Sequence, residues 1–441
     1  MSVRSFLDAA ERGVDALHGM VLLHGGEVVA EGYWHPYRGD VPHRLFSLSK
    51  SFTSTAVGFA VAEGLMGLDD PVAKYFGGRG DPRMLVRHLL TMTTGHVEDT
   101  APPITAGDDW AGAFLDLPVE REPGTHFVYN SGATYMLAAI VQRLTGRRLV
   151  EYLRPRLFDP LGFGDVTWER CPAGLDAGGW GMAARTSEIA RFGQVYLHDE
   201  RGILPGGWAA EATRFQVANA DAGESEDWRQ GYGLQFWRCR HGAFRGDGAF
   251  GQFCIVMPQQ DAVLALTAGT ADMQGVLDLV WAHLLHDTGP LKAPDAADAA
   301  ALGRLALPAI RGGSPGAVAG GTFVVQRPRT SRPQDWRPSH ERPPTIRAIT
   351  FAPGLVTIVD ETGVHEHVCR DGEWHTDGPA ASTGGWTGPF EYTFRVAYLD
   401  GPFVRTYRCR FEAGSVTVTA SDNVSFGPTG YAPIRAVPAA G

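Results

Sequence analysis

The stretch that decides the fold is RLFSLSKSFTSTAVG, residues 44–58. Small and apolar residues follow Ser47, and the pattern predicts a helix from about Ser47 to Gly64, where Gly64 and Gly67 stop it. Residues three apart share one face of a helix, so the Ser47 hydroxyl and the Lys50 amine can meet. The N-terminus of a helix also favours negative charge on the Ser47 oxygen.

The lysine of this tetrad, Ser47-Leu48-Ser49-Lys50, belongs to a chain with 36 arginines and only three lysines. About 0.1 chance Ser-x-x-Lys matches are expected at this composition. Lysine can lose its proton when buried, whereas arginine cannot, so Lys50 suits a general base beside a serine nucleophile. The alternative is structural: Ser47 caps the helix and Lys50 is an exposed residue of its first turn.

Length and composition exclude several classes of protein. The 441 residues predict one large domain and a smaller one, and 44% hydrophobic with 20% charged residues is typical of a globular protein. A net charge of -10 without a basic stripe argues against nucleic-acid binding. No signal peptide and no apolar run of about 20 residues is apparent, so we expect a cytoplasmic protein that does not enter membranes.

Metal and disulfide chemistry is not indicated either. The five cysteines are odd in number and none is closely paired, which predicts buried free thiols. His365 and His367 flank Glu366 on an expected strand, but without further ligands a surface strand is the better interpretation.

Periodicity predicts a mixed first part. Residues 19–33 form two strands joined at Gly25–Gly26, a hairpin signal. Strands are expected within residues 229–270, and helices over residues 5–18, 85–95, 131–145, 186–198 and 272–286.

The last third of the chain differs in composition. Residues 288–320 are rich in Ala, Pro and Gly, as linkers are. Residues 321–441 contain short strand-like segments separated by turns, which predicts a small antiparallel β-barrel. The expected organisation is therefore a domain over residues 1–287, a linker over 288–320 and a barrel over 321–441.

Five ordered segments now identify a family. They are RLFSLSKSFTSTAVG (44–58), GLMGLDDPVAKYF (64–76), VRHLLTMTTGH (86–96), EPGTHFVYNSGATYMLAAIV (122–141) and GWGMAARTSEIARFGQVYL (179–197). The sequence resembles the serine β-lactamase and penicillin-binding-protein superfamily. More narrowly, it is similar to class C β-lactamase-like serine hydrolases and family VIII carboxylesterases. The resemblance implies an α/β (α+β) domain with an antiparallel sheet flanked by helices and a helical subdomain.

The resemblance also implies catalytic roles. Ser47 is then the acylated nucleophile, Lys50 takes its proton, and Tyr129 shares the acid and base work. A tyrosine near a cation can have a lowered pKa, which suits that role. The family's Tyr-x-Asn reads Tyr129-Asn130-Ser131 here, so Ser131 stands at the asparagine position. Both Asn130 and Ser131 are candidate substrate-binding residues, with the alternative that Asn130 only supports the turn.

The family's third motif, Lys-Thr-Gly or His-x-Gly, has its expected counterpart at Ala249-Phe250-Gly251. Gly251 allows close backbone approach, and the N–H of Gln252 is expected to complete an oxyanion hole with that of Ser47. The motif's cation is missing, and an alternative register places Asp247 there. A substrate carboxylate would need Arg245 or Arg240 instead, so neutral esters or amides are favoured over penicillins.

The implied function is a serine hydrolase that acts through an acyl-enzyme on a small ester or amide, without metal or organic cofactor. The alternatives are an acyltransferase or peptide cyclase of secondary metabolism and a non-catalytic binding or sensor protein. The C-terminal part is similar to the lipocalin-like barrels attached to some enzymes of this superfamily, including serine hydrolases and cyclising thioesterases.

Overall fold

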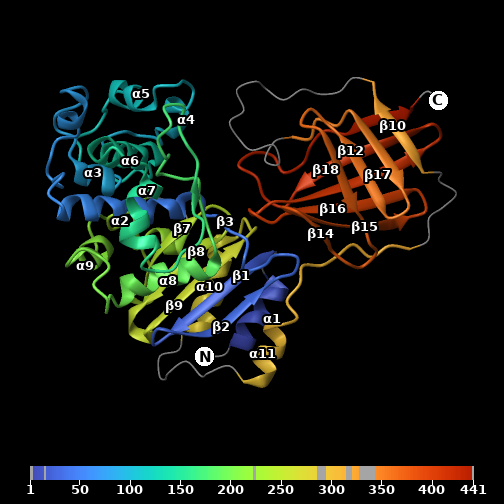
Figure 1. Ribbon diagram of the computed structural model, residues 1–441, viewed down its shortest axis with the longest axis horizontal. Coiled ribbons are helices and arrows are strands. Elements are labelled where there is room, and N and C mark those ends of the chain that lie inside the picture. The colour runs from blue at the N-terminus through green and yellow to red at the C-terminus, as the bar shows by residue number, and fades with distance from the viewer. Residues whose placement is uncertain are drawn as a thin grey trace. The chain divides into compact units, whose positions relative to one another are not determined.

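The computed structural model describes residues 3–13, 16–221, 225–285, 295–313, 320–326 and 343–439. They form two compact units (Figure 1). The first comprises the chain up to Gly32, Gly39–Ala268 and Asp272–Gly303, and the second comprises Tyr33–Arg38, Gly269–Ala271 and the chain from Arg304 onward. Helix α11 (Ala296–Leu302) lies within the stretch expected to be a linker. The domain boundaries expected at residues 287 and 320 stay a prediction.

A six-stranded sheet forms the centre of the first unit, in the order β2-β1-β9-β8-β7-β6. The neighbours from β1 to β6 pair antiparallel. The strands are β1 (Leu17–His24), β2 (Glu27–Tyr33), β6 (Trp237–Arg238), β7 (Phe244–Gly248), β8 (Gln252–Met257) and β9 (Ala262–Ala268). The β1–β2 hairpin turns at Gly25 and Gly26, both with positive φ, which confirms the predicted hairpin.

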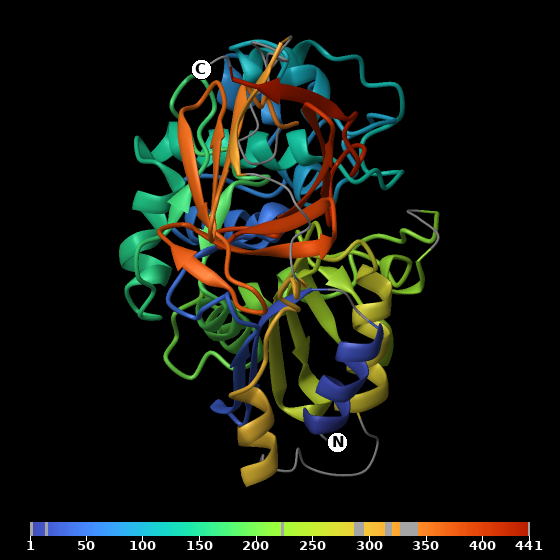
Figure 2. The same ribbon diagram turned by 90° about the vertical axis from the view of Figure 1, so that its right-hand side faces the viewer.

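Helices cover both faces of this sheet, and β8 and β9 are therefore buried along their whole length. Helix α8 (Thr186–Leu197) packs on one face, against β1, β8 and β9. Helices α1 (Val3–Gly13) and α10 (Met273–Leu284) pack side by side on the other face, which is turned toward the viewer in Figure 2. Strands β8 and β9 thus contribute alternate side chains to two apolar layers.

A helical part completes the first unit, with α2 and α6 packed together at its centre. Figure 1 shows it in blue to green beside the sheet. Its elements are α2 (Ser49–Ala62), η2 (Val72–Phe76), α3 (Val86–Leu90), α4 (Ala101–Ile104), α5 (Trp110–Asp116), α6 (Ser131–Thr145), α7 (Leu149–Leu153), η3 (Arg154–Phe158) and α9 (Trp208–Thr213).

The predicted helices differ in how well their ends agree with the structure. Helix α6 has the bounds predicted for residues 131–145, because Asn130 caps its start and Gly146 ends it in the left-handed conformation. The helix predicted over residues 5–18 ends at Gly13, since β1 begins at Leu17. The helix predicted over residues 85–95 ends at Leu90.

The second unit is a ten-stranded antiparallel sheet that curls into a nearly closed barrel. Its order is β13-β12-β11-β10-β19-β18-β17-β16-β15-β14. The strands are β10 (Gly321–Val325), β11 (Ala348–Ala352), β12 (Leu355–Val359), β13 (Val364–Val368), β14 (His375–Asp377), β15 (Ala380–Gly388), β16 (Glu391–Tyr398), β17 (Val404–Glu412), β18 (Ser415–Asp422) and β19 (Ile434–Pro438). The predicted fold class, a β-lactamase-like domain followed by an antiparallel barrel, is confirmed.

Alternation along the barrel strands builds its core. In β17 and β18, every second side chain is buried against Phe394 and Val396 of β16. One ion pair is buried within this barrel: the Arg405 guanidinium donates to both oxygens of Asp422, at 2.7 and 2.9 Å. Tyr431 donates to the same carboxylate. The arginine is thereby held by a fixed, two-pronged contact.

Two further expectations concern the whole chain. All five cysteines lie in the described part of the chain and are buried free thiols, as predicted. No helix among the described residues is both long and apolar enough to cross a membrane.

Gly193 tests the packing of α8 on the sheet. A Cβ at this position would lie 2.5 Å from Val263 Cγ1 and 2.8 Å from Cys254 Sγ. Gly193→Ala should therefore lower the free energy of unfolding of the first unit by about 1–3 kcal/mol through overpacking. Denaturant unfolding measures it, and Gly206→Ala is the control, because no heavy atom lies within 4 Å of a Cβ there. Equal stability of the two variants would contradict this packing.

Candidate active site

Ser47 occupies a tight turn directly before helix α2. The 3-10 turn η1 (Phe46–Leu48) precedes the helix, which begins at Ser49 rather than at Ser47 as predicted. Phe46 has a φ of +48°, a left-handed conformation that is rare for a non-glycine residue. Ser47 remains partly exposed whereas the first turns of α2 are buried. Strained backbone beside a partly exposed serine is frequent at active sites.

Two contacts fix this turn from outside. The N–H of Leu45 donates to the Met182 carbonyl of β5 (Met182–Ala184) at 2.8 Å. The N–H of Met182 donates in return to the Ser49 hydroxyl at 3.1 Å. Strand β5 pairs with β3 (His43–Arg44) and β4 (Thr167–Trp168) in a small three-stranded sheet. The position of Ser47 is therefore set by a sheet as well as by its own helix.

Lys50 is 2% exposed and contacts three oxygens. Its Nζ lies 2.9 Å from Ser47 Oγ, 3.2 Å from Ser131 Oγ and 2.7 Å from the Gly179 carbonyl. Three acceptors match the three protons of an ammonium group. The alternative interpretation, an exposed lysine in the first turn, is wrong.

Opposing effects set the proton affinity of Lys50. Burial lowers its pKa, whereas the carboxylates of Asp99 and Asp247 raise it, and the result is a pKa of about 8. A group with this pKa can take up and release a proton near neutral pH.

Tyr129 lies over the lysine. The Lys50 Nζ is 4.8 Å from the centre of the Tyr129 ring, which stacks on Trp237 with 5.2 Å between ring centres. Burial raises the pKa of Tyr129, Asp247 raises it further, and the hydrogen bond with Ser47 opposes them only in part. The expectation of a lowered pKa is therefore wrong, and Tyr129 is a neutral phenol next to the Ser47 oxygen.

The two residues after Tyr129 point in different directions. Asn130 is fully buried, and its Oδ1 accepts hydrogen bonds from the N–H of Ala133 at 3.0 Å and the Thr100 hydroxyl at 2.7 Å. This placement favours the interpretation that Asn130 supports the turn. Ser131 is the first residue of α6, and its hydroxyl meets Lys50. The substrate-binding roles of both residues stay predictions.

Strand β7 packs closely against the turn that carries Ser47, and Gly248 makes this close contact possible. A Cβ on Gly248 would lie 1.9 Å from the Leu45 carbonyl oxygen and 3.1 Å from the Leu48 nitrogen, so only glycine fits. Sequence analysis missed Gly248, although the alternation Gly246-x-Gly248 on a strand was a usable signal. Gly248 and Gln252 are register partners in the β7–β8 hairpin.

The predicted oxyanion residues lie in and after the turn of that hairpin. Gly251 has a φ of +93°, and Gln252 begins β8. The Gln252 side chain donates to the carbonyls of Ala249 at 3.0 Å and Ala268 at 2.8 Å, so it holds the turn in place. The oxyanion role of the Gln252 N–H stays a prediction.

The two arginines considered for a substrate carboxylate are both engaged elsewhere. Arg245 is fully buried, with its Nε and Nη2 each 3.0 Å from Asp247 Oδ2 and its guanidinium 4.2 Å from the Trp228 ring centre. Arg240 contacts the carboxylates of Asp227 and Asp278. Neither arginine can turn to a substrate without breaking these contacts.

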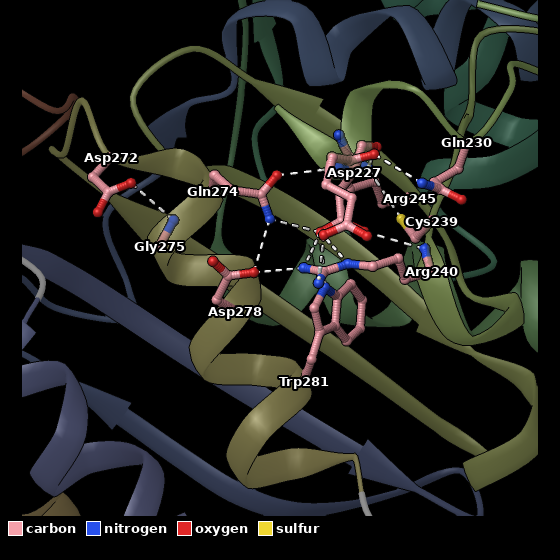
Figure 3. Close-up of polar contacts among 11 residues, drawn as sticks. Asp227, Gln230, Cys239, Arg240, Arg245, Asp272, Gln274, Gly275, Asp278 and Trp281 are labelled. Atoms are coloured by element: carbon pink, nitrogen blue, oxygen red, sulfur yellow. Dashed lines mark hydrogen bonds and ion pairs between the residues drawn. The ribbon is translucent and has the colours of Figure 1, made fainter. Parts of the chain in front are cut away.

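Asp227, which sequence analysis missed, contacts Arg240, Arg245 and helix α10 in the buried layer next to the site (Figure 3). It is fully buried in the turn η4 (Glu226–Trp228). Its Oδ2 accepts hydrogen bonds from Arg240 at 2.7 Å, Gln274 at 2.7 Å and Trp281 at 2.9 Å. Its carbonyl accepts one from Arg245 Nη1 at 2.8 Å. The Asp227 carboxylate thus fastens η4 to α10, whereas its backbone carbonyl holds Arg245.

Metal ligation finds no support in the described residues, among which no group of three His, Cys, Asp or Glu side chains could hold an ion. His365 instead lies 3.1 Å from Asp360 and is half-buried, opposite the core residue Ile358, so the interpretation of a surface strand is wrong for this side chain.

Residues 7–303 match the family Beta-lactamase. The chain belongs to this family. Among its relatives, it is 29% identical over 287 residues to the 6-aminohexanoate-dimer hydrolase of Paenarthrobacter ureafaciens, covering 57% of this chain and 72% of that protein. It is 30% identical over 176 residues to the esterase EstB of Burkholderia gladioli, covering 34% of this chain and 44% of EstB.

A solved structure resembles both units. The structure of SurE covers 98% of this chain and is itself covered over 98%, with a TM-score of 0.53 and 16% identity. At this identity the likeness concerns the fold alone.

Asp227→Asn tests the support behind the site. Burial opposes ionisation, but hydrogen bonds from Arg240, Gln274 and Trp281 lower the pKa of Asp227 to about 2. Its contribution to stability is complete above the unfolded pKa of about 3.9 and is lost as the pH falls through about 2. The variant should lose about 2–4 kcal/mol at pH 7 and depend less on pH between about 4 and 2.

Denaturant unfolding at a series of pH values measures both effects. Asp278→Asn is the control, because Asp278 contacts the same arginine from an exposed position and should cost less than about 1 kcal/mol. Similar losses in the two variants would show that Asp227 is not the centre of the cluster.

Proposed function

We propose that this member of the beta-lactamase family is a serine hydrolase that forms an acyl-enzyme at Ser47 from an ester or amide. One observation carries the proposal: Ser47 Oγ is partly exposed and lies 2.9 Å from the amine of Lys50, a buried lysine whose pKa is about 8. A serine hydroxyl needs an adjacent base to attack a carbonyl, and this amine is within hydrogen-bond reach.

Acylation then proceeds as follows. Neutral Lys50 takes the proton of Ser47 while the oxygen attacks the carbonyl carbon, and the carbonyl oxygen becomes an oxyanion. The intermediate collapses, the bond to the leaving alcohol or amine breaks, and the leaving group takes up a proton from the site. Water next attacks the acyl-enzyme, and the acid and free Ser47 are released.

Tyr129 acts in this scheme as a neutral donor. Its raised pKa makes a phenolate costly, so it is suited to donating a hydrogen bond to the reacting oxygen or to the leaving group. The stacked Trp237 holds the ring above Lys50. Backbone N–H groups of Ser47 and of the β7–β8 turn are the candidate donors to the oxyanion.

The charge of strand β7 favours neutral substrates. Its only cation, Arg245, is buried against Asp247, so this strand offers no free positive charge to a substrate carboxylate. The names of the two relatives, a 6-aminohexanoate-dimer hydrolase and an esterase, are consistent with ester or amide substrates.

Acyl transfer would use the same intermediate, with an amine or alcohol in place of water. Product analysis with added methanol separates the two outcomes, since a transferase forms the methyl ester in preference to the acid. A binding protein on this scaffold would form no acyl-enzyme at all.

Ser47→Ala tests the nucleophile. Treatment with a fluorophosphonate should add one adduct to the wild type, because Lys50 activates the Ser47 hydroxyl, and none to the variant. Intact-mass spectrometry measures both. Ser54→Ala is a control that should still take one adduct, since that hydroxyl is buried further along α2 and donates to the Leu234 carbonyl. The proposal fails if the wild type takes no adduct or Ser47→Ala takes one.

Substrate charge provides a second test. A neutral p-nitrophenyl butyrate should be hydrolysed with a kcat/KM at least about 100-fold above that of the p-nitrophenyl monoester of succinic acid, because an added carboxylate meets Asp247 without a free cation. Initial rates of both esters measure the ratio. Equal values would show that a cation elsewhere receives the carboxylate.

A further inference from the structure

Asp99 fixes the position of Ser131, whose hydroxyl contacts Lys50, the proposed general base. It lies in the loop before α4, and its Oδ1 accepts a hydrogen bond from the N–H of Ser131 at 2.7 Å and from the N–H of Ala101 at 3.0 Å. The N–H of Ser131 is one of the donors at the start of α6 that have no partner within the helix. Asp99 therefore caps the helix jointly with Asn130.

This contact leads directly to the nucleophile. The Ser131 hydroxyl lies 3.2 Å from Lys50 Nζ, and the same Nζ lies 2.9 Å from Ser47 Oγ. A shift of the first turn of α6 would move the Ser131 hydroxyl away from the lysine. Its position is thus fixed at the backbone by Asp99 and at the preceding residue by the buried Asn130.

Asp99 is also one of two carboxylates that raise the pKa of Lys50. Asp99 does so from the loop before α4 and Asp247 from strand β7, while Tyr129 covers the lysine with a neutral ring. Asp247 is paired with the buried Arg245. Asp99 has no ion pair among the described contacts, where its partners are backbone N–H groups.

Resting on the proposed function, we propose that Asp99 is the positioning residue for acylation: it holds Ser131 against Lys50 and supplies the negative charge that keeps Lys50 a strong enough base. Burial by itself lowers the pKa of Lys50, and the carboxylates of Asp99 and Asp247 oppose that effect. A nearby carboxylate restores its affinity for the Ser47 proton.

The chain offers a direct readout, because Lys50 is one of only three lysines. Protein labelled with ¹³C-lysine should give three side-chain signals, and the Lys74→Arg and Lys292→Arg variants assign the other two. Asp99→Asn keeps an oxygen acceptor for both N–H groups but removes the charge, so the Lys50 titration midpoint should fall by about one pH unit. Glu98→Gln removes the charge of the exposed neighbouring residue and should leave the midpoint unchanged.

The rate of Ser47 modification by fluorophosphonate gives the second readout. Its midpoint in a pH profile should move down with that of Lys50 in Asp99→Asn, and its alkaline plateau should fall, because the base is weaker. Asp99→Ala loses the acceptor as well, and its modification rate should fall at least about tenfold at every pH.

An unchanged Lys50 midpoint in Asp99→Asn overturns the inference, as does an Asp99→Ala protein modified as fast as the wild type. Loss of folding in Asp99→Ala would leave the decision to Asp99→Asn, whose side chain has the same shape. The proposed function fails separately: a wild type that takes no adduct rejects Ser47 as the nucleophile, whereas the lysine titration still decides the effect of Asp99.

Discussion

The site depends on keeping one lysine buried and still useful as a base. A buried ammonium needs a partner for each of its protons, and Lys50 finds them in Ser47 of the turn before its helix, a serine of α6 and the Gly179 carbonyl. These oxygens come from three separate segments of the chain. Helix α2, helix α6 and the Gly179 loop must therefore keep their relative positions for the lysine to remain in place.

Close backbone approach makes this arrangement possible. A Cβ on Gly179 would lie 2.6 Å from the Ser131 carbonyl, and one on Gly178 would lie 2.3 Å from the Ala138 side chain. Gly248 meets the nucleophile turn in the same way on the other side. Where no side chain intervenes, backbone groups and short serine side chains can reach the lysine. All three glycines are consequently constrained by contact, and Gly178 is also constrained by its φ of +70°.

Charge is distributed differently from the family pattern on which the sequence comparison relied. The strand that carries a cation in that pattern carries Asp247 here, and its arginine neighbour points into a buried layer formed by Trp228 and Cys239. Asp227 stabilises this layer through hydrogen bonds from Arg240 and Trp281. This buried layer packs beneath Trp237, which stacks on Tyr129, and it offers no free positive charge to the site.

The sequence by itself determined the elements with strong local signals. The β1–β2 hairpin was predicted from Gly25 and Gly26, which adopt positive φ, and α6 was predicted from periodicity, with ends that the structure assigns to the Asn130 cap and Gly146. The barrel followed from alternating strands, in which side chains point to opposite faces. The Ser47–Lys50 pair followed from helical spacing, since a contact between residues three apart is set by local geometry.

Only the tertiary structure decided what surrounds that pair. Asp99 and Asp247 reach Lys50 from positions far along the chain, and the pKa of Tyr129 is raised because burial outweighs its hydrogen bond with Ser47. The roles of Asp227 and Arg245 depend on which side chains meet in a buried layer. Burial and long-range electrostatics are properties of the packed chain, and no local pattern specifies them.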